Sequence, residues 1–383
     1  MDAHLADRPT ADVELPPLLI RHVEVIPVAL PLKKPVAMAF ETVAHARNIL
    51  VRIEAADGTV GWGEAASAPT MTGDTLDGLV AAVRDHLGPL LIGKDARSRP
   101  ALRRAMRAAL LGNTGAHSAV EMALFDLAGR VEGRPLIDLL GAAQRRAVAP
   151  MWLLGNSTPD ADIAEAQAKE REGFRFFKLK VGTKSIEREI AATHALRAAM
   201  GPHIPLCADA NCGLAPADAR RYVTETEADG LMFLEQPFAP DALDDLAMLS
   251  QNSPIPLGAD EAIHSLADIE TQARCGVGGV SLKLIKLGGL SNALAAADLC
   301  QKLNLSVNVA AKIAESSVAS AAAVHLACAL PDVSWGVSLT HFYLAEDVVR
   351  HPLPLGSGTV ALPDGPGLGV DVDEAAVARF RIR

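Results

Sequence analysis

The stretch FRFFKLKVG, residues 174–182, predicts a strand buried on both faces, because large apolar side chains occur on both of its alternating sides. Lys178 and Lys180 lie on the same side of this strand. An ammonium group without a partner costs on the order of several kcal/mol to bury. We therefore expect both lysines to face a group that compensates their charge.

Similar strands recur along the second part of the chain, and helical stretches separate them. Eight are expected, at APMWLLG (149–155), FRFFKLKVG (174–182), IPLCADAN (204–211), GLMFLEQP (230–237), IPLGADE (255–261), GVSLKLIKLGG (279–289), LSVNVAAK (305–312) and VSWGVSL (333–339). Strands that alternate with helices form parallel sheets, and this number of strands favours a closed barrel over an open sheet. No Gly-x-Gly-x-x-Gly pattern follows the first strand, so the sequence does not indicate a nucleotide-binding sheet.

The rest of the chain divides around this barrel, to which we assign residues 146–345. Residues 21–145 predict an α+β domain, in which strand patterns come first and helical patterns follow. Residues 1–20 are acidic, lack the apolar region of a signal peptide and predict a disordered tail. Residues 346–383 lose the alternation of strands and helices, and we expect them to pack on the N-terminal domain.

Composition excludes several classes of partner. The chain of 383 residues carries a net charge of −10 and has no dense basic stretch, which argues against nucleic acid and anionic membrane surfaces as partners. No apolar run reaches the length of a membrane span. The 5 cysteines show no metal-binding spacing and predict reduced thiols. We therefore expect a cytoplasmic protein.

Three carboxylates follow neighbouring strands of the predicted barrel: Asp209, Glu235 and Asp260. In α/β barrels, functional groups gather at the carboxyl ends of the strands. Three anions at one point repel each other unless a cation lies among them, and ligands that are all oxygen suit Mg²⁺. Alternatively, each acid could cap the helix that follows it. Three acids at matched strand ends favour the metal site.

Two lysines are placed to work beside such a metal. Lys180 ends the second strand and Lys283 the sixth, on the far side of the barrel. A substrate whose carboxylate binds the metal between them could lose an α-proton to one lysine and gain a proton from the other. A lysine base needs a pKa lowered toward neutrality, and both Lys178 and the metal could lower it.

This combination of motifs resembles the enolase superfamily, and within it the muconate lactonizing enzyme subgroup. The resemblance rests on KLK (178–180), DAN (209–211), EQP (235–237), ADE (259–261), LKLIKLGG (282–289), GWGEA (61–65), GNTGAHSAVEMALFDLAGR (112–130) and GPGLGV (365–370). It implies an α/β fold, a (β/α)7β modified TIM barrel, with an α+β capping domain that the C-terminal tail completes. The resemblance implies an enzyme whose substrate is a small carboxylate. Large barrels with capping domains often assemble, so we also expect a homo-oligomer.

The resemblance also implies roles for individual residues. Asp209, Glu235 and Asp260 match the ligands of one Mg²⁺, which Mn²⁺ could replace, and Lys180 and Lys283 match the acid/base pair.

Further residues match the support of this centre, namely Lys178, Asn211 and Glu261. In LKLIK, Lys283 is the lysine that matches, and we expect Lys286 to face a loop.

Substrate choice in this subgroup depends on two capping-domain loops, here 37–42 and 66–75, and on the late strands. Glu41 stands where bacterial Ala-Glu epimerases carry an arginine, and Lys312 stands where a small residue is usual. GVSLT, which ends at Thr340, replaces the Asp-x-Asp of dipeptide epimerases. These departures disfavour an ordinary L-Ala-D/L-Glu epimerase.

Several functions remain open at this point. The leading hypothesis is a racemase or epimerase of an amino-acid derivative or dipeptide, which uses both lysines through an enediolate intermediate. The alternative is a muconate-type cycloisomerase, which needs only one lysine as acid/base. A dehydratase of an acid sugar would show His or Arg signatures that the sequence lacks. A catalytically silent barrel is disfavoured by the intact set of acids and lysines.

Overall fold

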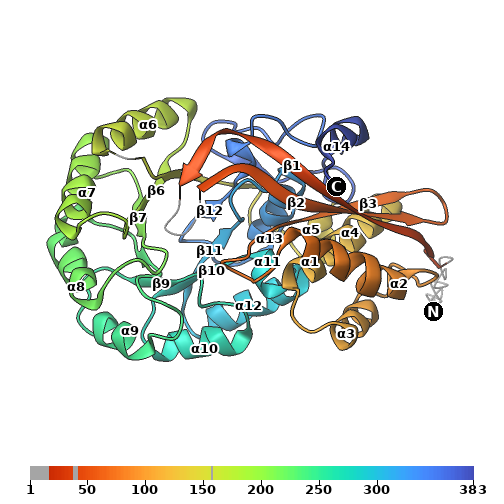
Figure 1. Cartoon of the computed structure of the whole chain (residues 1–383), viewed down its shortest axis with the longest axis horizontal. Coiled ribbons are helices and arrows are strands. Elements are labelled where there is room, and N and C mark those ends of the chain that lie inside the picture. The colour runs from red at the N-terminus through yellow and green to blue at the C-terminus, as the bar shows by residue number, and fades with distance from the viewer. Residues whose placement is uncertain (1–16, 38–41, 157) are drawn as a thin grey trace, which may run out of the picture.

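The computed structural model describes residues 17–37, 42–156 and 158–383. An antiparallel sheet with helices forms the N-terminal part, and a parallel barrel surrounded by helices forms the larger part (Figure 1). Glu41 and most of the predicted 37–42 loop lie outside the described residues.

Eight parallel strands form the barrel: β5 (Met151–Leu154), β6 (Phe176–Lys180), β7 (Leu206–Asp209), β8 (Leu234–Glu235), β9 (Leu257–Ala259), β10 (Gly279–Leu282), β11 (Ser306–Ala310) and β12 (Val337–Ser338). They pair in chain order, and a bridge between Pro150 and Val337 joins the last strand to the first. Lys180 pairs with Asp209, and Asp209 with Glu235, so the ends of these strands are level. The predicted fold class is confirmed.

A helix follows each strand from β5 to β11: α6 (Pro159–Glu172), α7 (Ile186–Met200), α8 (Pro216–Glu225), α9 (Leu243–Ser250), α10 (Leu266–Arg274), α12 (Leu290–Lys302) and α13 (Ser317–Ala329). Shorter turns are η2 (Glu227–Asp229), α11 (Leu284–Leu287) and η3 (His341–Tyr343). Side-chain hydroxyl groups cap the N-termini of three of the long helices. Thr158, Ser265 and Ser316 each accept a backbone N–H from the first turn.

Aromatic rings close the amino end of the barrel. Phe233 and Trp335 precede β8 and β12, and their rings stack with centroids 4.1 Å apart. A methyl group on Gly258 or Gly279 would lie 2.8 Å from the Trp335 ring, so both glycines are needed to admit it. The floor of the barrel is therefore packed, and polar side chains occupy the opposite, carboxyl end.

The capping sheet has the order β1 (Ile20–Ala37), β2 (Thr42–Ala55) and β3 (Val60–Ala66). Its helices are α1 (Leu76–Ala81), the π-helix η1 (Ala82–Leu87), α2 (Gly88–Leu91), α3 (Arg99–Ala109), α4 (Thr114–Glu132) and α5 (Leu136–Leu140). Most of α4 is buried, because it contacts β3 on one side and the barrel turn α11 on the other.

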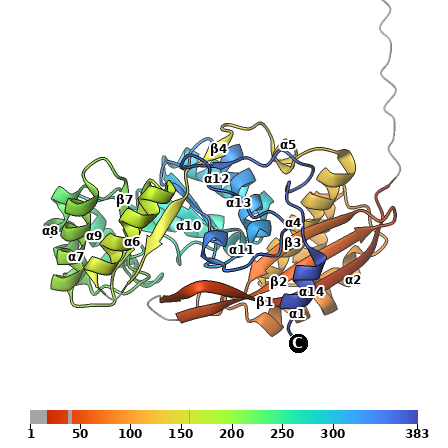
Figure 2. The ribbon, with the colours of Figure 1, turned by 90° about the horizontal axis from the view of Figure 1, so that it is seen from above.

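The C-terminal segment contacts both parts of the molecule. Its elements are β13 (Val360–Ala361), which pairs with β4 (Ala147–Val148), and α14 (Glu374–Phe380), which lies against β1 (Figure 2). Asp126 on α4 is fully buried and accepts backbone N–H groups from Trp62 at 2.8 Å and Leu368 at 2.7 Å. One carboxylate thus ties the capping sheet, helix α4 and the C-terminal segment together.

All the cysteines are free thiols; Cys207, Cys300 and Cys328 are buried and the other two are half-buried. Among the described residues, no helix combines the length and apolarity of a membrane span.

We predict that Gly63→Ala destabilises the protein by about 1–3 kcal/mol or more, because β3 packs too closely on α4 to admit a side chain. A methyl group at Gly63 would lie 2.0 Å from the carbonyl oxygen of Ala119. Urea unfolding of the purified variant measures the effect. The control is Gly356→Ala, where nothing lies within 4 Å of the added methyl group. Equal stability of the two variants would contradict this account of the packing.

Candidate active site

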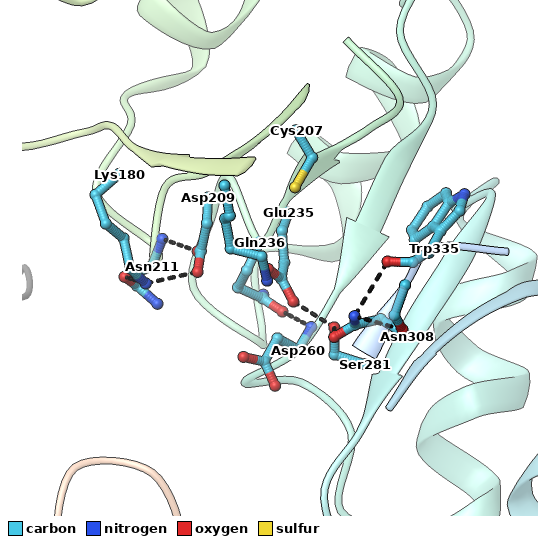
Figure 3. A network of polar contacts seen from close by, with 12 residues as sticks. Lys180, Cys207, Asp209, Asn211, Glu235, Gln236, Asp260, Ser281, Asn308 and Trp335 are labelled. Atoms are coloured by element: carbon cyan, nitrogen blue, oxygen red, sulfur yellow. Dashed lines mark hydrogen bonds and ion pairs between the residues drawn. The ribbon is translucent and has the colours of Figure 1, made fainter. Parts of the chain in front are cut away.

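Three carboxylates lie at the carboxyl ends of adjacent barrel strands, as the sequence pattern suggested. Asp209 ends β7, Glu235 ends β8 and Asp260 follows β9, and each is at most 3% exposed. Figure 3 shows them side by side on neighbouring strands.

Ammonium groups neutralise these carboxylates. Lys180 Nζ lies 2.6 Å from Asp209 Oδ2, and the same ammonium donates to the Asn211 amide oxygen. Lys178, the other lysine of the same strand face, donates to Glu235 Oε2. The partners that compensate the charges of the buried Lys178 and the half-buried Lys180 are therefore the carboxylates of the next two strands.

The two candidate acid/base lysines lie on opposite sides of this group. Lys180 ends β6, and Lys283 directly follows β10 and donates to Asp260 Oδ2. With β7, β8 and β9 between them, these two strands are four positions apart in the ring of eight. The carboxylates thus fill the arc between the two lysines.

The prediction that Lys286 faces a loop is wrong. Its side chain is fully buried, and its ammonium lies 2.5 Å from Asp260 Oδ1 and 3.1 Å from the carbonyl oxygen of Ser281. The sequence suggested a strand through this stretch, whereas α11 begins at Leu284. One helical turn brings residues three apart onto one face, so Lys283 and Lys286 reach the same carboxylate.

Burial and charge act against each other on the pKa values of these groups. Burial raises the pKa of Asp260, but Lys283 and Lys286 outweigh burial and hold it well below its usual range. The pKa of Glu235 is raised by burial and by repulsion from Asp209 and Asp260, in spite of Lys178. The three carboxylates are therefore close enough to repel one another.

The pKa of Lys283 differs from the sequence-based expectation. Burial lowers it, but Asp260, Glu261 and Glu235 have the larger combined effect and raise it above its ordinary value. A general base requires the opposite direction. The negative charge of the surrounding carboxylates raises this pKa, and a metal cation bound among those carboxylates would offset their charge.

The donor set fits a hard divalent cation. It consists of carboxylate oxygens without His or Cys, and the repulsion within it is what a cation relieves. The described residues contain no group of three acidic, His or Cys side chains close enough together to hold an ion, and lysine ammonium groups contact the carboxylate oxygens. A metal would therefore replace the contacts of Lys178, Lys180 and Lys283 with the carboxylates.

Asn211, Glu261 and Gln236 hold the ends of β7 and β9 in place. The Asn211 backbone N–H donates to Asp209 Oδ1 at 3.0 Å, and its side-chain amide donates to Glu261 at 2.8 Å. Burial, together with the charges of Asp260 and Asp209, raises the pKa of Glu261 to about 7. Gln236 Oε1 accepts the Asp260 backbone N–H at 2.8 Å, a role that the EQP motif alone did not reveal.

A cavity of about 80 Å³ opens among these groups. Its walls include the candidate acid/base lysines and two of the acids, together with Lys178, Asn211, Lys312, Thr340, Tyr343, Met71, Met151 and Leu153. Met71 belongs to the 66–75 capping loop, so this loop reaches the site. A larger cavity of about 490 Å³ lies between α3, α4, α10 and α12, but none of the predicted site residues lines it.

Two of the predicted specificity residues are at the cavity wall. Lys312 is buried, with 5% of its surface exposed. The Thr340 hydroxyl donates to the Lys312 carbonyl oxygen at 2.7 Å and accepts the Glu315 N–H at 3.1 Å. Thr340 therefore fixes the backbone after β11.

Glu315, to which the sequence gave no role, is a buried acid beside the site. Its Oε2 accepts the Lys312 N–H at 3.0 Å, and burial together with the charge of Glu64 raises its pKa to about 8. Glu64, at the end of the capping GWGEA motif, is itself fully buried and accepts the Ser316 hydroxyl at 2.5 Å and the Ala319 N–H at 3.1 Å. The capping sheet thus holds the start of α13 through one carboxylate.

Known proteins share this architecture. Residues 161–376 match a family model described as enolase C-terminal domain-like, and residues 20–141 match the mandelate racemase / muconate lactonizing enzyme N-terminal domain. A chloromuconate cycloisomerase of Pseudomonas putida is 32% identical, over 94% of this chain and 98% of that protein. An L-Ala-D/L-Glu epimerase of Bacillus subtilis is 30% identical, over 92% of this chain and 96% of that protein.

A solved structure supports the same relationship. A muconate lactonizing enzyme from Pseudomonas fluorescens complexed with muconolactone matches with a TM-score of 0.92 and 30% identity, over 96% of this chain and 100% of that chain. The barrel, the capping sheet and these relatives define an isomerase of the enolase superfamily. Within it, the chain belongs to the mandelate racemase / muconate lactonizing enzyme family, whose enzymes generally depend on Mg²⁺.

We predict that Glu315→Gln removes a pH-dependent loss of stability. The folded-state pKa of about 8 exceeds the ordinary value of 4.5, so this group favours folding at pH below 4.5 and loses that contribution as the pH rises to 8. Between pH 5 and 8, the free energy of unfolding should fall by about 2–4 kcal/mol more in the wild type than in the variant.

Urea unfolding at several pH values measures this difference. Glu227→Gln, at an exposed glutamate, serves as the control and should follow the wild type. Parallel pH profiles for wild type and Glu315→Gln would refute the raised pKa.

Proposed function

We propose that the protein abstracts the proton α to a substrate carboxylate with the help of Mg²⁺, and that it racemises or epimerises an amino-acid derivative or dipeptide. The observation that carries this proposal is the opposition of Lys180 and Lys283 across the barrel, with the three carboxylates between them. Two proton carriers on opposite sides of one α-carbon are what inversion at that carbon requires.

The residues that would hold the ion are Asp209, Glu235 and Asp260. When bound, Mg²⁺ would neutralise the negative charge that develops on the substrate carboxylate.

The chain's own residues perform the proton transfer in this proposal. Lys180 removes the proton from one face of the α-carbon, and Lys283 delivers a proton to the other; the reverse reaction exchanges these roles. Lys178 stands beside Lys180 as a second cation and disfavours additional positive charge there. The confined cavity, with Met151 and Leu153 on its wall, limits water around both ammonium groups.

A muconate-type cycloisomerase is the second candidate, because relatives of both kinds resemble the chain. The chloromuconate cycloisomerase and the epimerase match the chain at nearly equal identity. The two candidates differ in how many lysines they need, which makes them separable by mutation.

We also propose that Lys312, on the cavity wall, contacts the part of the substrate away from the reacting carbon. Glu41 is kept as a candidate for the same role from the sequence alone.

Removal of divalent metal should abolish activity, and added Mg²⁺ should restore it. Turnover of EDTA-treated enzyme, followed by polarimetry with N-acyl amino acids and dipeptides, measures this. Glu235→Gln should lower turnover on the order of 100-fold or more, because it removes one charged ligand. Undiminished activity in EDTA, or in Glu235→Gln, would overturn the metal site.

The lysine variants should separate the two half-reactions. Lys180→Ala and Lys283→Ala should each keep exchange of the α-proton with ²H₂O from one enantiomer only, and each should lose racemisation by about 10²–10⁴-fold. Proton NMR of each pure enantiomer measures the exchange. If Lys283→Ala racemises at the wild-type rate, the two-base proposal fails; if it cyclises muconate instead, the second candidate gains.

A further inference from the structure

Each of the three carboxylates is held differently at its two oxygens. One oxygen of each accepts from a lysine that lines the cavity; these pairs are Asp209 Oδ2 with Lys180, Glu235 Oε2 with Lys178 and Asp260 Oδ2 with Lys283. The other oxygen accepts from a second donor; these pairs are Asp209 Oδ1 with the Asn211 N–H, Glu235 Oε1 with the Ser281 hydroxyl and Asp260 Oδ1 with the Lys286 ammonium.

Ser281 is buried between Glu235 and Asn308. Its side chain is 1% exposed, and its hydroxyl also lies 3.2 Å from Asn308 Oδ1 (Figure 3). The Asn308 amide nitrogen donates to the carbonyl oxygens of Trp335 at 3.1 Å and Gly336 at 3.0 Å. Because both amide hydrogens are used, Asn308 presents only its oxygen to Ser281. The single hydroxyl hydrogen of Ser281 therefore has two acceptors to choose from, and Glu235 Oε1 is the closer one.

Lys286 is fixed more completely. Its ammonium donates to Asp260 Oδ1, to the Asp260 carbonyl oxygen and to the Ser281 carbonyl oxygen, which uses all three of its hydrogens. It is fully buried and is not part of the cavity wall. Leaving this position would therefore strand a buried charge, whereas the cavity-lining lysines have open space beside them.

We propose that Ser281 and Lys286 are positioning residues that fix one oxygen of Glu235 and of Asp260, so that each carboxylate offers only its other oxygen to a divalent ion. This positioning role rests on the proposed Mg²⁺ site, and it would give that site a preference for Mg²⁺ over Ca²⁺. Mg²⁺ requires near-octahedral geometry and takes one oxygen per carboxylate, whereas Ca²⁺ accepts carboxylates through both oxygens. Holding the second oxygen therefore favours Mg²⁺ over Ca²⁺.

The test compares the affinities of the two ions. Isothermal titration calorimetry with MgCl₂ and with CaCl₂ is carried out on chelator-treated full-length wild type, Ser281→Ala and Lys286→Met. The control is Ser320→Ala, because Ser320 is equally buried but its hydroxyl contacts His341 at 2.9 Å rather than a carboxylate. We expect the ratio of the Ca²⁺ to the Mg²⁺ dissociation constant to fall about tenfold in Ser281→Ala and Lys286→Met, and to stay unchanged in Ser320→Ala.

The outcomes are distinguishable. A change in general stability would weaken both ions together and leave the ratio constant. A ratio within about twofold of the wild type in folded Ser281→Ala overturns the positioning role, and that variant alone decides if Lys286→Met does not fold. Wild-type protein that binds neither ion would overturn the Mg²⁺ site itself, and the selectivity proposal with it.

Discussion

The confinement of three carboxylates at the centre of a barrel is the constraint on which the rest of the site depends. Asp209, Glu235 and Asp260 are almost fully buried, and each would be costly there without compensation. Parallel strands with level ends bring them together, and the lysines of β6 and of the turn after β10 offset their charge. The same opposition of charges that permits burial places Lys180 and Lys283 on opposite sides of the carboxylates.

The eight strands and the acids at their ends could be predicted, because apolar runs and barrel topology are local signals with one geometric consequence. The residues that contact these acids could not be predicted from the sequence. Lys286 was missed because a helical turn begins inside an apparent strand. Ser281 and Asn308 occur singly within apolar strands, and nothing in their spacing indicates that they meet across β10 and β11. Contacts between strands depend on register, which the sequence does not state.

Buried carboxylates also join the domains. Asp126 and Glu64 each accept backbone N–H groups from elements far away in the chain, the first from the C-terminal segment and the second from the start of α13. Each such acid replaces water with several protein donors, so removing it would leave those N–H groups buried and unpaired. The capping domain is thereby fixed above the cavity, and its 66–75 loop, which carries Met71, is held at the cavity wall.

The aromatic floor has a kinetic consequence. Phe233 and Trp335 stack at the amino end of the barrel, and the Trp335 ring packs directly against Gly258 and Gly279. Reactant and product must therefore pass through the same opening, under the capping loop. A product that has not yet departed obstructs the next reactant, so inhibition by product should be competitive, and the rate of product release bears on the steady-state rate.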